Sequence, residues 1–220
     1  MFQMMNEARI GVGLQATSIA TAAYYNALEY ANVRLQGRKL TEKDPLKPQI
    51  PIIEHADVKR MLLFQKAIIE GTLALEMQAC VYLDKSKTSE GEEKESNFLK
   101  LELLTPIVKS YPAEMSILTT STALQIFGGY GFTKEFLAEL FFRETRIHTL
   151  HEGTTAIHGM DLLGRKVMMK NGQATMLLMQ EVFQDIEAAK KFDSLKTHAE
   201  TIEQKLTHLQ ELTMRLMGVE

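Results

Sequence analysis

The 220-residue chain lacks most of the features that mark specialised protein classes. Its single cysteine, Cys80, cannot form an internal disulfide, so a reducing compartment is the default. The formal net charge is −3 and neither half is conspicuously basic, which argues against a nucleic-acid partner. No apolar run approaches the roughly 20 residues that a helix needs to cross a bilayer. The composition therefore favours an ordinary globular protein with no membrane span, and no metal site is predicted.

Proline and glycine are scarce, with 5 and 13 residues, and they cluster between long segments of helical periodicity. Because no segment alternates with period two, the sequence predicts an all-α fold. We expect an antiparallel up-and-down four-helix bundle with extra C-terminal helices. The expected division is a bundle over residues 1–170 and a helical extension over residues 171–220. The expected helices cover about residues 2–34, 54–85, 96–127, 133–148 and 154–170, with two more after residue 173.

Local patterns refine this expectation. The charged stretch 87–95 is expected to be a solvated linker. Cys80 lies among apolar neighbours and is expected to be a small core residue. The N-terminus looks as if it begins inside a helix, which hints at a piece of a longer protein. One face of the first helix is expected to carry Ile10, Leu14, Ala20, Tyr24, Leu28 and Ala31.

Two features between residues 125 and 166 point to chemistry. Gly128–Gly131 breaks the helical pattern and exposes backbone groups that a large cofactor could approach. Glu152 stands directly before Gly153 and the start of another helix, so a turn holds its carboxylate. Taken alone, Glu152 is better explained as an acidic residue that complements a helix dipole.

Several motifs that occur in a fixed order favour a catalytic role for Glu152 instead. Gln125-Ile-Phe-Gly-Gly-Tyr-Gly-Phe132 is followed by Arg143-Glu-Thr-Arg-Ile147 and then by Glu152-Gly-Thr154. This series resembles the C-terminal signature of the acyl-CoA dehydrogenase family. The likeness covers residues 1 to about 170. Residues 161–167 are most similar to a longer subgroup that includes the 3-methylmercaptopropionyl-CoA dehydrogenases.

The resemblance implies an FAD-dependent oxidoreductase of fatty acid β-oxidation and lipid metabolism. Glu152 would be the base that removes the α-proton of an acyl-CoA thioester, and the β-hydrogen would leave as hydride to the flavin, giving a trans-2-enoyl-CoA. A carboxylate that substrate and flavin shield from water becomes a stronger base. The family's other two domains, including its β-domain, have no counterpart in these 220 residues, so the chain alone is expected to bind flavin weakly and to be inactive.

The resemblance also implies roles for residues outside Glu152. Those expected to contact FAD, in this family often across a subunit interface, are Arg34, Gln125, Gly129 and Thr154. Those expected to contact acyl-CoA are Asn6, Arg9 and Gly153, although a solvated helix face explains Asn6 about equally well. Arg143 and Glu144 are expected to form a structural ion pair.

The same likeness implies partners and leaves alternatives open. An electron-transferring flavoprotein is the expected electron acceptor, and a homodimer or homotetramer the expected assembly, in a bacterial cytoplasm or a mitochondrial matrix. His151 stands where the family usually has tyrosine, so the substrate pocket is expected to differ. The alternatives are an acyl-CoA oxidase, a DNA-associated flavoprotein and a non-catalytic helical dimerisation module. Residues 173–220 hold five Lys or Arg against eight acids, which argues against DNA.

Overall fold

The computed structural model describes the backbone of residues 2–217 and the side chains of residues 6–216. Within residues 2–217 there is no β-strand, and the one isolated bridge joins Leu35 to Pro51. The all-α prediction is therefore confirmed. The long helices are α1 (Phe2–Val33), α2 (Ala56–Thr88), α3 (Gly91–Phe127), α6 (Gln173–Ala189) and α7 (Asp193–Met217). The short ones are η1 (Ile52–Glu54), η2 (Gly128–Phe132), α4 (Ala138–Thr145), η3 (Arg146–Thr149), α5 (Thr155–Asp161) and the π-turn η4 (Leu162–Lys166).

The chain divides into two compact units, and both α2 and α3 contribute to each. Unit 1 comprises Met1–Cys80 and Ile107–Thr155, and unit 2 comprises Val81–Pro106 and Ala156–Glu220. The division at residue 170 that the sequence indicates is a different partition and stays a prediction.

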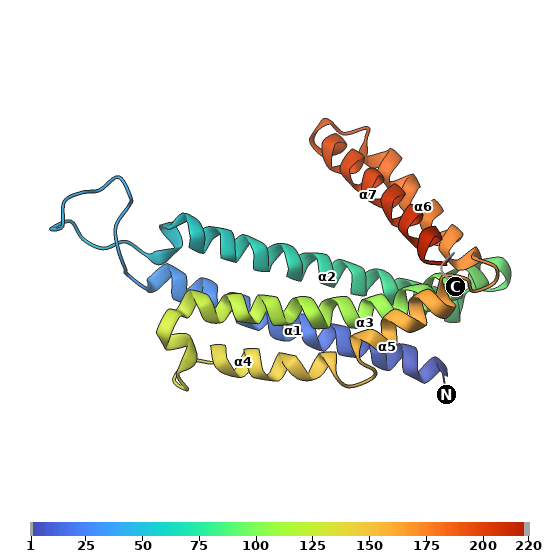
Figure 1. Cartoon of the computed structure of the whole chain (residues 1–220), viewed down its shortest axis with the longest axis horizontal. Helices are drawn as coiled ribbons and strands as arrows, with labels where there is room; N and C mark the ends of the chain where they lie inside the picture. The colour runs from blue at the N-terminus through green and yellow to red at the C-terminus, as the bar shows by residue number, and fades with distance from the viewer. Residues whose placement is uncertain (1, 218–220) are drawn as a thin grey trace. The chain divides into compact units, whose positions relative to one another are not determined.

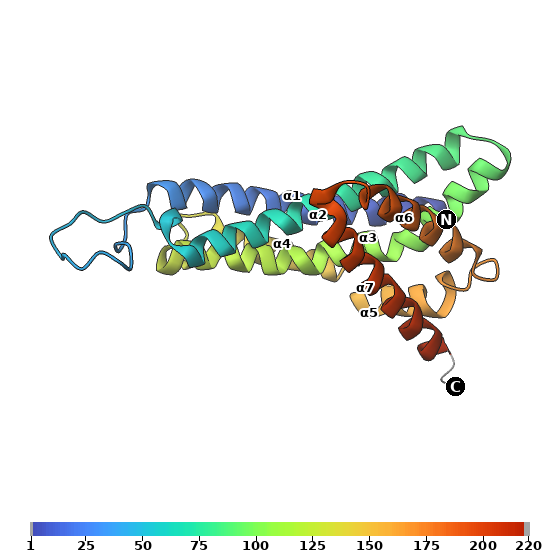
Figure 2. The same cartoon turned by 90° about the horizontal axis from the view of Figure 1, so that it is seen from above.

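Unit 1 is built on α1 to α4, which alternate in direction as an up-and-down bundle (Figures 1 and 2). Its core combines small side chains of α1 with larger ones of α2 and α3. The buried members are Ala23, Ala27, Ala31, Ile52, Met61, Leu62, Ala123, Ile126, Phe127 and Ala138. Small residues on α1 let neighbouring helices approach closely, and the rings of Tyr30 and Phe127 stack at a centroid distance of 4.3 Å.

The core face of α1 differs in part from the predicted one. Ala20 and Ala31 are buried as expected, but Leu14 is 38% exposed. Ala16, which was not predicted to lie on the core face, is completely buried. The predicted linker at 87–95 is also mostly helical, because α2 ends at Thr88 and α3 begins at Gly91. A left-handed Gly91 turns the chain there, and acidic residues in the first turn of α3 complement its dipole.

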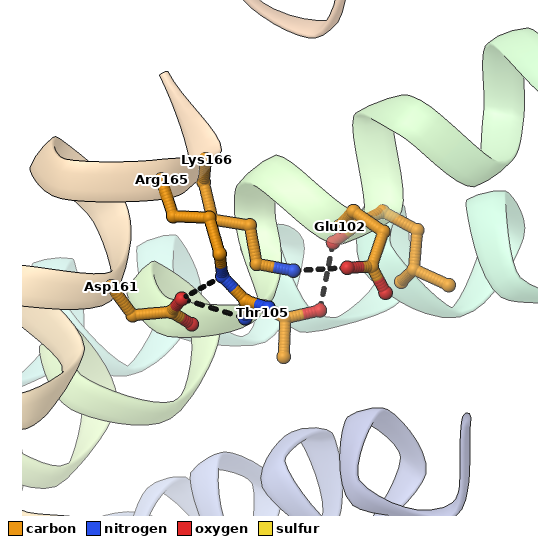
Figure 3. Close-up of polar contacts among 6 residues, drawn as sticks. Glu102, Thr105, Asp161, Arg165 and Lys166 are labelled. Atoms are coloured by element: carbon orange, nitrogen blue, oxygen red, sulfur yellow. Dashed lines mark hydrogen bonds and ion pairs between the residues drawn. The ribbon is translucent and has the colours of Figure 1, made fainter. Parts of the chain in front are cut away.

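Unit 2 has its own apolar cluster, in which Leu99 and Leu103 of α3 pack with Ala174 of α6. The helices α6 and α7 contact each other across a short turn. A buried ion pair joins the two sequence segments of the unit, because the ammonium of Lys166 donates to Glu102 of α3 (Figure 3). Arg165 is paired with Asp161 one turn earlier. The C-terminal segment is therefore tied to α3 by charge as well as by apolar contacts.

Candidate active site

The Glu152 turn is the most unusual backbone feature of unit 1. Glu152 has φ 55° and Gly153 has φ 96°, so two consecutive residues lie in the left-handed region. Glycine adopts this region readily, but for glutamate it is strained and persists only where the surroundings hold it. Left-handed non-glycine residues cluster at functional sites, which makes this turn a candidate.

Helix α3 holds the turn on both sides of Thr154. The ammonium of Lys109 donates to the carbonyl of Gly153 at 2.5 Å. Five residues further along α3, Glu114 accepts a hydrogen bond from the hydroxyl of Thr155. The backbone from 153 to 155 is therefore fixed to a rigid helix, while the side chain of Glu152 itself is exposed.

Two positively charged side chains, Lys109 and Arg9, belong to the surroundings of the Glu152 turn. Lys109 is fully buried, and burial lowers its pKa. Glu114 and Glu152 oppose that shift, and the charge of Arg9 adds to it, so all three charged groups lie within electrostatic reach of the lysine. Arg9 belongs to the first turns of α1, and α1 also packs against η3, which precedes the turn.

His148 is the buried titratable group that precedes the turn. Its Nδ1 lies 3.1 Å from the carbonyl oxygen of Thr145, and because a carbonyl only accepts, the proton is on Nδ1. Burial lowers the pKa of His148, an effect that Thr145 opposes and that the neighbouring His151 and Lys109 reinforce. The ring of His151 stands 5.6 Å from that of His148, and its Nδ1 donates to the carbonyl of Ile147 at 2.9 Å. The lowered pKa favours the neutral form of His148, whose ring packs near that of His151 just before Glu152.

The predicted site residues fall into two groups. Asn6, which is buried, and Arg9 lie at the start of α1, at the end of the bundle where the chain passes from α4 to α5 through the Glu152 turn (Figure 1). Gly153 and Thr154 are part of that turn. The structure thus brings the three predicted acyl-CoA contacts to the neighbourhood of Glu152.

The remaining predicted FAD contacts lie at the opposite end of unit 1. Arg34 follows the end of α1, and its guanidinium carbon lies 5.2 Å from the ring centroid of Tyr130. Gln125 and Gly129 lie at the junction of α3 and η2, the short helix that contains Tyr130. With a rise of 1.5 Å per residue, 25 residues of helix separate Arg9 from Arg34 by roughly 38 Å. One chain therefore does not bring Thr154 together with Arg34, Gln125 and Gly129.

The backbone around Arg34 is well fixed. Its carbonyl accepts a hydrogen bond from the amide of Ile52 at 2.9 Å, and the amide of Gln36 donates to the carbonyl of Ile50 at 3.0 Å. The imidazole of His55 closes the loop through the carbonyl of Gln36 at 2.8 Å. The Nε of Arg34 is buried and has no hydrogen-bond partner among the described residues. A positioned guanidinium with a spare donor is suited to an anion such as a phosphate.

Sequence reasoning missed Lys109, His148 and Glu114. Lys109 stands alone in an apolar part of α3, and a single lysine in a helix has no sequence signature that distinguishes burial from exposure. Glu114 and His148 likewise belong to no motif of their own. Only the path of the chain after α4, which returns to the middle of α3, identifies them as neighbours of Glu152.

The part of the chain that the structure describes lacks two further kinds of feature. Among residues 2–217, no helix is both long and apolar enough to span a membrane. Among residues 6–216, whose side chains the structure describes, no three His, Cys, Asp or Glu side chains are grouped in a way that could hold a metal ion.

Comparison with known proteins places the fold and its motifs in context. Residues 1–168 match the family model described as acyl-CoA dehydrogenase, C-terminal domain. A butyryl-CoA dehydrogenase of Syntrophomonas wolfei is 42% identical over 174 residues, which is 79% of this chain and 28% of that protein. The 3-methylmercaptopropionyl-CoA dehydrogenase of Ruegeria pomeroyi is 40% identical over 173 residues, 79% of this chain and 29% of that one.

A solved structure extends the likeness of fold beyond the family match. The crystal structure of Caenorhabditis elegans ACDH-11 in complex with C11-CoA has a TM-score of 0.83 at 21% identity, over 96% of this chain and 33% of that one. The chain thus spans about a third or less of the length of each of these proteins. Its ordered motifs, its helical bundle and the match over residues 1–168 all agree: the chain belongs to the acyl-CoA dehydrogenase family, and residues 1–168 correspond to its C-terminal domain.

Proposed function

We propose that this chain is the C-terminal domain of a flavin-dependent acyl-CoA dehydrogenase that converts an acyl-CoA thioester to a trans-2-enoyl-CoA, with Glu152 as the base. The observation that carries the proposal is the strained turn. Glu152 is held in the left-handed region, with α3 bonded to Gly153 and Thr155 immediately after it. In a member of this family, such a turn presents an exposed carboxylate from a rigid support.

The chemistry assigned to this chain's residues is proton transfer and positioning. The Glu152 carboxylate takes the proton from the carbon next to the thioester carbonyl. Arg9 and Lys109 place positive charge beside the turn. A rigid support matters because misplacing a reacting group by about 1 Å costs on the order of 100-fold in rate. Asn6, Arg9 and Gly153 are the proposed contacts of the acyl-CoA.

The residues at the other end of the bundle fit a dinucleotide. Arg34 offers a buried Nε–H with no partner among the described residues, and Tyr130 offers an aromatic face next to it. A Cβ at Gly128 or Gly129 would meet nothing within 4 Å, so their backbone is open to a ligand. When bound, the flavin of FAD accepts the β-hydrogen with its two electrons.

The separation of the two groups bears on the assembly. Arg34, Gln125 and Gly129 of one chain lie roughly 38 Å along α1 from the Arg9 end of the bundle, where Thr154 lies. We therefore propose that one flavin is bound by Thr154 of one copy and by the Arg34 group of another, within a homodimer or homotetramer. An electron-transferring flavoprotein is the proposed electron acceptor. Because two relatives are named for butyryl-CoA and 3-methylmercaptopropionyl-CoA, these are the first substrates to test.

The test is flavin reduction in the full-length enzyme that carries this domain. Addition of acyl-CoA is expected to bleach the flavin, and Glu152→Gln is expected to slow that bleaching by at least about 100-fold while FAD stays bound. Glu144→Gln is the matched control, because Glu144 is a nearby exposed carboxylate that pairs with Arg143. Bleaching by Glu152→Gln at the parent rate would show that another group is the base. Rapid reoxidation by oxygen alone would indicate an oxidase instead.

A further inference from the structure

Lys109 is a fully buried cation whose recorded hydrogen bond goes to a backbone carbonyl and not to a carboxylate. A lysine ammonium has three donors and is costly to bury without a negative partner. The charges of Glu114 and Glu152 interact with it, but its hydrogen bond goes to the neutral carbonyl of Gly153. A buried ammonium bonded to a neutral partner calls for an explanation beyond the stability of the bundle.

The packing of α1 on α3 places Lys109 where it is. A Cβ at Gly13 would collide with the carbonyl oxygen of Val108, so α1 approaches α3 closely beside Lys109. Gly13 lies one helical turn after Arg9 on α1. The glycine therefore lets the two helices cross closely, and the guanidinium of Arg9 lies within electrostatic reach of the Lys109 ammonium. From this position Lys109 also reaches the turn that follows η3.

The partner atom is significant because of its position in the chain. The carbonyl of Gly153 follows the strained φ angles of Glu152 and Gly153, so a bond to it holds both residues. Glu114 holds Thr155, which lies after the two strained residues. Lys109 therefore binds the segment that contains the two strained residues, whereas Glu114 binds beyond it. Its charge also interacts with that of Glu152.

We propose that Lys109 is a positioning residue for the base: by binding the Gly153 carbonyl, it keeps Glu152 in its left-handed conformation and its carboxylate directed at the substrate. The inference rests on the proposed function of Glu152. Lys109 touches neither substrate nor flavin in this role and acts through the backbone of the turn.

The first experiment also uses the full-length enzyme that carries this domain and does not depend on activity. Amide hydrogen exchange is measured for the peptide that covers residues 151–155, because exchange reports local opening. Lys109→Met, which keeps the length of the side chain but removes its donors, is expected to speed exchange there by about 10-fold or more. Lys166→Met is the matched control, since it removes the other fully buried lysine and is expected to leave residues 151–155 unchanged.

The second experiment measures flavin reduction by acyl-CoA in the full-length enzyme. Lys109→Met is expected to slow reduction by about 10- to 100-fold with FAD bound and with the Kd for acyl-CoA changed less than about 3-fold. Lys166→Met is expected to stay within about 2-fold of the parent, although both substitutions lower thermal stability. A role in stability alone would lower the Tm of both variants and the rate of neither.

The outcomes separate the two proposals. If Glu152→Gln abolishes reduction while Lys109→Met reduces as fast as the parent, the inference about Lys109 is wrong and the base assignment stands. If Glu152→Gln reduces normally, the proposed function fails, and the exchange experiment still decides whether Lys109 holds the turn. Unchanged exchange at 151–155 overturns the inference in either case. Should Lys109→Met not fold, Lys109→Gln takes its place, with an effect in the same direction.

Discussion

The two units treat their buried ionisable groups differently. In unit 2, Lys166 is paired with Glu102, and Lys100 with Glu181 at 2.7 Å. In unit 1, Lys109 is bonded to the carbonyl of Gly153 and Glu76 to the hydroxyl of Thr17, both neutral partners. An oppositely charged partner favours the charged form of a buried group. A neutral partner does so less, and the effect of burial on the pKa of the group then prevails.

The pKa shifts follow this division. In unit 1, burial raises the pKa of Glu76 to about 7 and lowers the pKa values of Lys109 and His148, so all three move toward the neutral form. In unit 2, burial of Glu181 is outweighed by the hydrogen bonds from Lys100 and Tyr82, and its pKa is lowered toward the charged form. Groups whose pKa is strongly shifted by burial gather at functional sites. The difference in pKa shifts therefore agrees with the proposal that Glu152 of unit 1 is the base, while the pairs of unit 2 have a structural role.

The largest expected effect breaks a pair in unit 2. Glu102→Ala leaves the ammonium of Lys166, which is 2% exposed, without its carboxylate. Such a loss costs about 3–5 kcal/mol, and since Glu102 is partly exposed we expect a value near the lower end. Urea unfolding followed by circular dichroism measures it. The control is Glu95→Ala, which breaks the exposed pair with Lys170 and is expected to cost less than about 1 kcal/mol. Equal costs would remove the distinction between the pairs.

The next largest effect is the pH dependence of stability that Glu76 of unit 1 causes. Glu76 is buried, accepts from Thr17 at 2.8 Å, and its second carboxyl oxygen has no partner among the described residues. Its pKa rises from 4.5 in the unfolded chain to about 7, so the folded state binds this proton more tightly. The stability that results is complete below about pH 4.5 and is lost as the pH rises through about 7.

Glu76→Gln isolates that effect because glutamine cannot titrate. Between pH 4.5 and pH 8, the free energy of unfolding of the parent is expected to fall by roughly 3 kcal/mol relative to the variant. Measuring the difference cancels the opposite contribution of His148, whose lowered pKa makes stability fall as the medium is acidified. Parallel curves for the two proteins would show that Glu76 is charged in the folded state, and the contrast between the units would weaken.

The smallest effect tests a neutral member of a charged network. Tyr82 of unit 2 donates to Glu181 at 2.8 Å, next to the ammonium of Lys100. Tyr82→Phe is expected to cost about 1–2 kcal/mol and to raise the pKa of Glu181, because one donor to the carboxylate is lost. Tyr111→Phe, at a tyrosine 47% exposed, is the control and is expected to change stability by less than about 0.5 kcal/mol. Thermal unfolding of both variants at one pH checks this; equal shifts would mean that the Tyr82 hydroxyl adds nothing.

Much of the helical organisation was predictable from local patterns. The expected break at 193–194 falls at the start of α7, and the expected bounds of α1 and α2 lie within a few residues of the observed ones. The core face was harder to predict. Leu14 was expected inside and is 38% exposed, whereas the neighbouring Gly13 lies against the backbone of α3 at Val108. Cys80, expected in the core, is only partly buried.

The candidate site divides in the same way. The motif of Glu152, Gly153 and Thr154 could be read from the sequence, because its residues are neighbours in the chain. The contacts with Lys109 and Glu114 join residues about 40 positions apart, and no local pattern reports them. The separation of the Arg34 group from Glu152 also required the structure, since it depends on the length and direction of α1.

By itself, the sequence determined that the chain is helical, where most of its helices lie, and which ordered motifs it shares with a flavoprotein family. These properties depend on residues close together in the chain, whose periodicity and spacing are visible in the sequence. Only the tertiary structure decided which charges are buried and what they contact, because burial depends on which helix faces meet. The strained Glu152 turn, and the lysine that holds it, exist only where α3 and the segment after α4 come together.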